Sequence, residues 1–108
     1  MSVRVICLEP DGRAVTLEVP RGASVMSAAM AAGVEGIEAQ CGGNMVCATC
    51  HCYVQEPWPA RLPPPSDDER LMLRNVAAEL RASSRLSCQL TVQPELEGLT
   101  VQFPDRQS

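Results

Sequence analysis

The sequence predicts an α+β fold, a small mixed sheet with a helix packed across it. Two observations lead to this expectation. Residues 2–9, 14–19 and 99–103 alternate apolar and polar side chains, which is typical of half-buried strands. Residues 25–32 and 67–80 instead carry helical patterns, one before and one after a cysteine-rich stretch. Strands and helices that are interleaved in this way favour one α+β domain, residues 1–108.

The first two strands are expected to pair as a hairpin. In residues 2–9, Val3, Val5 and Cys7 share one face, and residues 14–19 repeat the alternation. Between them, residues 9–12 read Glu-Pro-Asp-Gly, which is strong turn chemistry. We interpret Cys7 as a buried core thiol, because free cysteine is among the most buried residue types.

The first helix is predicted over residues 25–32. Ser24 is a good N-cap, and Gly33 suits a C-terminal stop. Met26 and Met30 lie four residues apart, so we expect both to face the core.

The second helix is predicted over residues 67–80, after a proline-rich stretch that breaks regular structure. Ser66 and Glu69 form a capping-box pattern at its start. An apolar stripe then recurs at helical spacing, made of Leu73, Val76, Ala77 and Leu80. Farther on, residues 85–90 are expected to bring Cys88 back as a strand begins, and residues 94–98 are expected to turn into the last strand.

Composition limits the possible functions. The net charge of −4 argues against binding to nucleic acid or to an anionic membrane surface, and favours partners with basic patches. No apolar run approaches the ~20 residues of a membrane span. The first residues lack the apolar stretch of a secretory signal, so six cysteines indicate metal-bound thiols in a reducing cytoplasm. We expect a cytoplasmic monomer.

Four of the cysteines follow the pattern C-x5-C-x2-C-x37-C, and they are Cys41, Cys47, Cys50 and Cys88. A 2Fe-2S cluster needs four thiolates, and three local ligands with one distant ligand can enclose so compact an object. Gly42 and Gly43 allow the backbone to approach closely. The pattern therefore predicts one 2Fe-2S cluster and an electron carrier that is not an enzyme.

Other interpretations of the cysteines have less support from the spacing. Structural zinc usually takes two close cysteine pairs, whereas this chain has one, so zinc stays open as the less favoured alternative. A Rieske centre needs two histidines, and His51 is the only one. Cys52 is interpreted as a packed structural thiol. His51 either hydrogen-bonds within the cysteine loop or is an ordinary imidazole.

These residues together resemble the putidaredoxin- and adrenodoxin-type 2Fe-2S ferredoxins over nearly the whole chain. The motifs that carry the likeness are Cys41-Gly42-Gly43, Cys47-Ala48-Thr49-Cys50-His51, residues 84–89 and residues 104–107. The resemblance implies a β-grasp fold and cluster ligation by Cys41, Cys47, Cys50 and Cys88. It also implies electron transfer from an FAD-containing, NAD(P)H-dependent ferredoxin reductase to a cytochrome P-450 monooxygenase.

Three positions depart from the family pattern: Gln40 before the first cysteine, Arg74 on the second helix and the terminal Ser108. Because interface charge governs steering and discrimination, these changes bear on which partner docks. The sequence therefore supports three hypotheses: a monooxygenase electron carrier, a ferredoxin for iron–sulfur cluster assembly, and a zinc-structured interaction module.

Overall fold

The computed structural model describes residues 2–37, 50–76, 78–105 and 107. Cys41, Cys47 and the glycines between them lie outside the described residues. A five-stranded mixed sheet runs through the described part in the order β2-β1-β5-β3-β4. The β1–β5 pair is parallel and the other pairs are antiparallel, so the sheet is mixed, as predicted. The strands are β1 (Ser2–Leu8), β2 (Ala14–Pro20), β3 (His51–Val54), β4 (Ser84–Leu86) and β5 (Leu99–Gln102).

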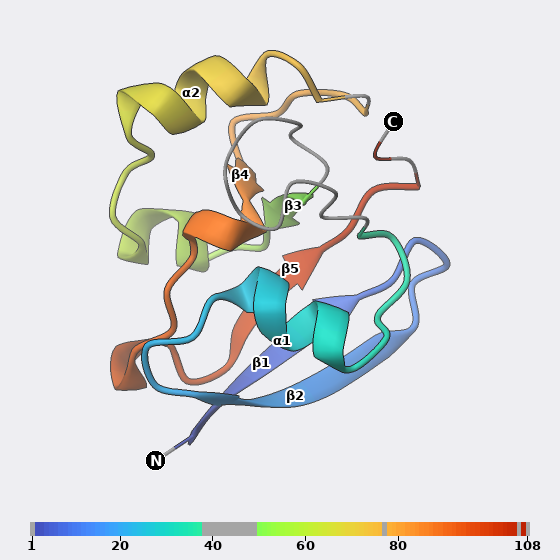
Figure 1. The fold of residues 1–108 in the computed structure, drawn as a ribbon, viewed down its shortest axis with the longest axis vertical. Coiled ribbons are helices and arrows are strands. Elements are labelled where there is room, and N and C mark those ends of the chain that lie inside the picture. The colour runs from blue at the N-terminus through green and yellow to red at the C-terminus, as the bar shows by residue number, and fades with distance from the viewer. Residues whose placement is uncertain (1, 38–49, 77, 106, 108) are drawn as a thin grey trace.

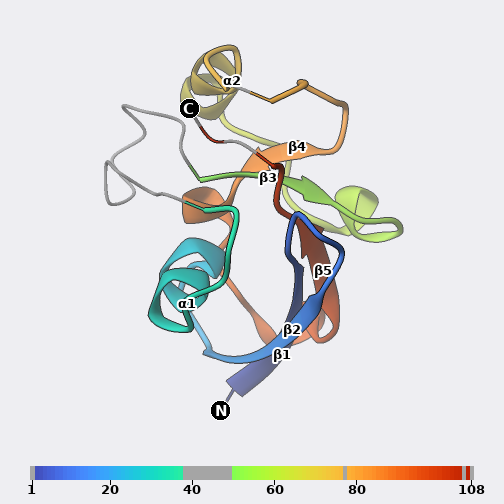
Figure 2. The same cartoon turned by 90° about the vertical axis from the view of Figure 1, so that its right-hand side faces the viewer.

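The two α-helices lie at opposite ends of this sheet (Figure 1; Figure 2). Helix α1 (Val25–Ala31) packs against β2, and α2 (Asp67–Leu73) packs against β4. Three short 3-10 helices complete the described elements: η1 (Trp58–Arg61), η2 (Ser87–Gln89) and η3 (Pro94–Leu96). In space, β3, β4 and η2 lie between α1 and α2 (Figure 1). Two of the four motif cysteines, Cys50 and Cys88, belong to this part of the fold.

The N-terminal hairpin forms as predicted. Cys7 pairs with Val15 across it, and Val3, Val5 and Cys7 are all buried on one face. At the turn, the Gly12 N–H donates to the Glu9 carbonyl at 2.8 Å with φ +90° at Gly12. This left-handed conformation is one that glycine adopts readily.

Helix α1 forms within one residue of the predicted 25–32, but only one of the two methionines predicted to face the core is even partly buried. Ser24 caps the helix by accepting from the Ser27 N–H at 3.1 Å. The buried residues are Val25 and Ala29, whereas Met30 is 46% exposed. Met26 is partly buried against a second apolar cluster. The helix turns its small residues to the sheet, so the buried stripe runs one position away from the predicted methionine pair.

Helix α2 is shorter than the predicted 67–80 and ends at Leu73. Directly beyond Leu73 the chain continues in tighter turns, in which the N–H groups of Arg74, Asn75 and Val76 donate to carbonyls three residues earlier. The Tyr53 hydroxyl donates to the Glu79 carbonyl, and the Arg81 N–H donates to Ser84 Oγ at 2.8 Å. Leu80, the last residue of the predicted stripe, is exposed. These contacts with β3 and β4 replace the hydrogen bonds of further helical turns.

The capping box at the start of α2 forms only in part. Ser66 Oγ accepts from the Glu69 N–H at 3.1 Å, as predicted. The Glu69 carboxylate turns to β4, where it accepts from Arg85 Nε at 2.8 Å, Arg85 Nη2 at 3.0 Å and the Leu86 N–H at 3.0 Å. Glu69 is 1% exposed, so this bidentate pair fastens α2 to β4 away from water.

The chain between α1 and the cysteine loop is held tightly against the C-terminal segment. A Cβ added at Gly36 would lie 2.8 Å from Phe103 Cβ and 2.9 Å from Pro10 Cδ. Gly36 also has φ +96°, and the preceding residue, Glu35, donates its N–H to Glu9 Oε2 at 2.8 Å. Only glycine fits this close approach.

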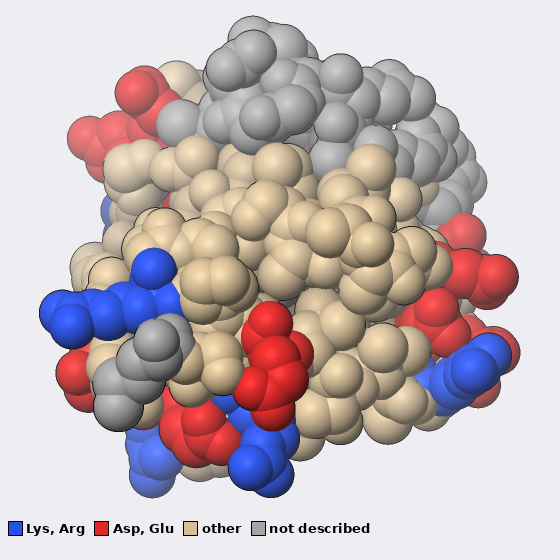
Figure 3. All heavy atoms as spheres, turned by 60° about the horizontal axis from the view of Figure 1, so that its bottom comes forward, with Lys and Arg blue, Asp and Glu red and all other residues tan. Residues whose placement is uncertain are grey.

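On the face shown in Figure 3, the acidic and basic side chains of the described residues are interspersed. Acidic and basic side chains lie beside one another along its edge, around a broad uncharged area. The exposed side chains of Arg4 and Glu97 form an ion pair at 3.5 Å. Within the described residues, no helix has the length and apolarity needed to cross a bilayer.

We predict that Gly36→Ala lowers the free energy of unfolding by about 3 kcal/mol, since it adds both left-handed strain and overpacking. Gly12→Ala is the matched control, because Gly12 has φ +90° but open space where a Cβ would lie. It should cost about 1 kcal/mol. Urea unfolding under anaerobic conditions measures both, and equal losses would contradict the close approach at Gly36.

We predict that Glu69→Gln lowers the free energy of unfolding by about 3 kcal/mol, because it leaves the Arg85 charge without its buried partner. Glu79→Gln breaks the exposed pair with Arg81 and should change stability by no more than about 0.5 kcal/mol. Chemical denaturation of both variants makes the comparison. A Glu69→Gln variant as stable as Glu79→Gln would show that the buried pair does not fasten α2.

Candidate metal centre

Strand pairing brings Cys50 and Cys88 together across the fold. Cys50 directly precedes β3, and Cys88 lies in η2, directly after β4. The antiparallel pairing of β3 with β4 sets His51 opposite Leu86. Both the N–H and the hydroxyl of Ser87 then donate to the Cys50 carbonyl at 2.9 Å. The predicted strand through Cys88 is wrong, because β4 ends at Leu86 and η2 turns the thiol toward Cys50.

The two thiols occupy a small apolar cluster of their own. Cys50 is buried with Leu73 and Leu86, and Cys88 is half-buried at its edge. Partly buried side chains pack around it from α1, from the chain after α1 and from the region of α2, and they are Met26, Ile37, Met72 and Val76. Such a surround excludes water and supplies no charge, while the half-buried Cys88 keeps the site near the surface.

The thiols interact directly with each other. A hydrogen bond between the Cys50 and Cys88 side chains, together with burial, raises the pKa of the Cys50 thiol above its usual range. The Gln89 amide also donates to Cys88 Sγ at 3.5 Å. Two adjoining thiols in an apolar surround, one with an N–H donor on its sulfur, fit a metal-thiolate site, and ligation would release their protons.

The rest of the predicted ligand set cannot be placed. Cys41 and Cys47 lie outside the described residues. Within residues 2–37, 50–76, 78–105 and 107, no group of three metal-binding side chains comes together. The described half of the site therefore supplies Cys50 and Cys88, and the remaining two ligands stay a prediction from the sequence.

The two other cysteines belong to the main core. Cys7 and Cys52 are both fully buried there, apart from the cluster that contains Cys50 and Cys88. Burial, reinforced by the Glu9 charge, raises the pKa of Cys7 to about 12. Burial likewise raises the pKa of Cys52. Neutral, inert thiols in these positions match the predicted packing roles.

His51 is buried and bonded within the frame of the site. Its Nε2 lies 2.9 Å from Ser84 Oγ, and its backbone N–H donates to Gln107 Oε1 at 3.0 Å. Its Nδ1 has no hydrogen-bond partner among the described residues. Burial, and then the charge of Arg81, lower the pKa of His51 to about 4, so the imidazole is neutral at pH 7. The described contacts make His51 a buried strand residue bonded to Ser84 and Gln107, and a hydrogen bond within the cysteine loop would involve residues outside the described ones.

Sequence reasoning missed two side chains that support this centre. Ser87 holds the Cys50 carbonyl, and Gln107 bonds the backbone on both sides of the cysteine loop. Both lie in stretches that carry the family likeness, residues 84–89 and 104–107, but the local pattern assigns neither side chain a role. The sequence pattern does indicate Glu69, but as a helix cap rather than as the partner of Arg85. A buried polar role depends on long-range contacts that the local pattern does not contain.

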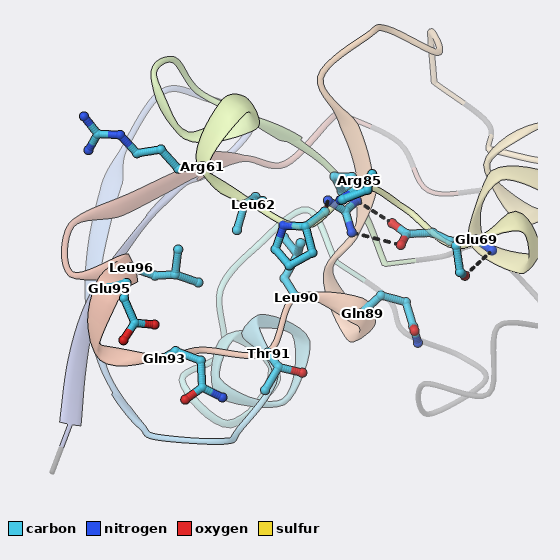
Figure 4. A pocket seen from close by; sticks show the side chains of 13 residues that line it. Arg61, Leu62, Glu69, Arg85, Gln89, Leu90, Thr91, Gln93, Glu95 and Leu96 are labelled. Carbon is cyan, nitrogen blue, oxygen red and sulfur yellow. Dashed lines mark hydrogen bonds and ion pairs between the residues drawn. The ribbon is translucent and has the colours of Figure 1, made fainter.

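A surface hollow of about 550 Å³ borders the site through Gln89 (Figure 4). Leu62, Leu90 and Leu96 line its floor. Two of its charged lining residues, Glu69 and Arg85, are bonded to each other, as the dashed lines show.

Comparison with known proteins supplies the family. Residues 8–93 match the family model of the 2Fe-2S iron–sulfur cluster binding domain. Rhodocoxin from Rhodococcus erythropolis is 46% identical over 95% of this chain and 96% of its own. Putidaredoxin from Pseudomonas putida is 43% identical over 96% of this chain and 97% of its own.

Solved structures agree in fold. A crystal structure of a ferredoxin from Rhodopseudomonas palustris HaA2 has a TM-score of 0.94 and 44% identity, covering 97% of this chain and 99% of its own. Putidaredoxin within its covalent complex with putidaredoxin reductase has a TM-score of 0.92 and 44% identity, covering 95% and 99%. With its α+β fold and its paired thiols, this chain belongs to the 2Fe-2S ferredoxins of the putidaredoxin type, electron carriers with one 2Fe-2S cluster.

Proposed function

We propose that this chain, as a single domain of residues 1–108, carries one electron from an FAD-containing, NAD(P)H-dependent ferredoxin reductase to a cytochrome P-450 monooxygenase. The observation that carries the proposal is the meeting of Cys50 and Cys88 in an apolar cluster near the surface. The likeness to putidaredoxin bound to its reductase supports the first partner. Membership of the same family supports the second.

The proposed ligands are Cys41, Cys47, Cys50 and Cys88. Bound to them, a 2Fe-2S cluster supplies one-electron redox chemistry. The protein's own groups define its surroundings: Leu73 and Leu86 exclude water beside Cys50, and the Gln89 N–H at the Cys88 sulfur stabilises negative charge there. Burial and N–H donors of this kind tune the reduction potential.

The competing hypotheses have less support. A zinc-structured module disagrees with a family model that binds 2Fe-2S clusters. A cluster-assembly ferredoxin shares the same chemistry, but relatives such as rhodocoxin at 46% identity and the ferredoxin CarAc of Sphingomonas at 47% do not favour it. A deletion strain that lost iron–sulfur enzyme activity would favour the assembly role.

We further propose a cytoplasmic monomer. Cys7 and Cys52, which are not among the proposed ligands, are thiols outside any disulfide, as a reducing compartment would keep them. Electron-transfer encounters are small and transient, commonly below ~1,200 Å², and a monomer leaves the surface near Cys88 available for successive partners.

We predict that Cys88→Ser loses most of the visible absorbance of the purified protein, because it removes a proposed ligand. Cys7→Ala and Cys52→Ala are the controls, since both thiols lie in the main core. Their visible spectra should match that of the unaltered protein. Absorbance and iron content measure the effect. Loss of iron from Cys52→Ala with retention by Cys88→Ser would overturn the ligand assignment.

We predict that substrate turnover in a reconstituted system requires this protein. The mixture contains NADH, a ferredoxin reductase and a cytochrome P-450 from the same genome, with product formation as the readout. The Cys88→Ser variant, which keeps the surface but not the cluster, should not support turnover. Reduction of the cluster by the reductase without onward transfer to any cytochrome P-450 in the genome would count against the proposed recipient.

A further inference from the structure

The side chain of Gln107 bonds the chain on both sides of the cysteine-rich loop. Its Nε2 donates to the Gly36 carbonyl at 2.7 Å and to the His51 carbonyl at 2.8 Å. Its Oε1 accepts from the His51 N–H at 3.0 Å. Residues 37–50, between these two anchor points, contain three of the four proposed cluster ligands.

We propose that Gln107 is a positioning residue, which ties the entrance of the cysteine loop to its exit and thereby slows release of the cluster. This inference rests on the proposed ligand set of Cys41, Cys47, Cys50 and Cys88. Gln107 acts through the backbone of Gly36 and His51 and does not itself touch the cluster.

The chemistry of the amide suits this task. A primary amide has two N–H donors on one side and a carbonyl acceptor on the other. Here both donors face carbonyls and the acceptor faces an N–H, so only one orientation of the side chain satisfies all three contacts. Glutamate in the same place would set a negative oxygen against a carbonyl.

Because the three hydrogen bonds are buried, their loss is expected to be costly. Gln107 is 4% exposed and His51 is fully buried, so water does not readily replace the lost contacts. The entrance is otherwise fixed by rigid packing, because Gly36 abuts Phe103 and Pro10. The exit is fixed by the pairing of His51 with Leu86. Gln107 is therefore a direct bridge between two segments that are each held by separate parts of the sheet.

The chain offers a matched control in Gln102. Its Nε2 lies within hydrogen-bonding distance of three carbonyls, which share its two N–H donors: Leu8 at 3.2 Å, Glu9 at 2.9 Å and Phe103 at 2.9 Å. These contacts join β5 to the end of β1 and reach Glu9 and Phe103, which pack at the loop entrance, but they do not connect that entrance to the exit at His51. Loss of the Gln102 amide thus removes a similar set of bonds and leaves the direct bridge between the loop ends in place.

The test compares Gln107→Met with Gln102→Met in the cluster-loaded protein, since methionine keeps the length of glutamine and removes its polar contacts. Cluster release into an iron chelator is followed by loss of visible absorbance. We expect Gln107→Met to release the cluster about tenfold faster than the unaltered protein. Gln102→Met should change the rate by less than about twofold.

Two further readouts separate positioning from general stability. Visible-region circular dichroism, which reports the surroundings of the cluster, should change in Gln107→Met and not in Gln102→Met. Amide exchange at His51 should accelerate in Gln107→Met alone. Equal release rates and equal spectra for the two variants would overturn the inference, whereas an unaltered protein without iron would overturn the proposed function instead.

If Gln107→Met does not yield folded protein, amide exchange in the unaltered protein tests whether the Gln107 bridge holds. The His51 N–H should then exchange as slowly as the Val54 N–H of the same strand, which donates to the Ser83 carbonyl at 2.9 Å. Much faster exchange at His51 would show that the bridge does not hold, and would overturn the inference.

Discussion

The fold brings its two described motif cysteines together through one backbone carbonyl. The carbonyl of Cys50 accepts both hydrogen-bond donors of Ser87, next to Cys88 in sequence. This contact exists because β3 lies between β5 and β4, so a strand that leaves the cysteine loop must meet the segment that carries the distant thiol. The sheet order, rather than any local turn, closes the long gap in the cysteine pattern.

Around that contact, buried polar side chains form hydrogen bonds between elements that are far apart in the sequence. Glu69 joins α2 to β4, and Gln107 joins the C-terminal segment to β3 and to the chain after α1. Apart from His51 Nδ1, every buried side-chain nitrogen or oxygen in the described residues has a partner. A frame with paired polar groups has one favoured arrangement, which suits a site whose ligands come from distant segments.

Much of this arrangement could be predicted from local patterns. Alternation predicts the hairpin, Ser24 and Ser66 indicate both helix starts, and the cysteine spacing indicates the cluster. Local patterns failed where distant contacts decide the outcome. The apolar stripe continues to Leu80 in the sequence, but α2 ends at Leu73. Farther along, the Glu79 carbonyl accepts a hydrogen bond from the Tyr53 hydroxyl of β3 and not from a helical N–H. Likewise, the stretch 104–107 carries the family likeness, but only the folded chain shows that the Gln107 side chain bonds both loop ends.

The claim on which the account depends is that four thiolates hold a pair of irons that exchanges single electrons. Anaerobic visible and EPR spectra of the purified protein, taken before and after dithionite with iron and sulfide counted, test it most directly. The account predicts a coloured, EPR-silent protein that bleaches on reduction and then shows one unpaired electron for every two irons. A colourless protein with stoichiometric zinc and no iron would contradict it.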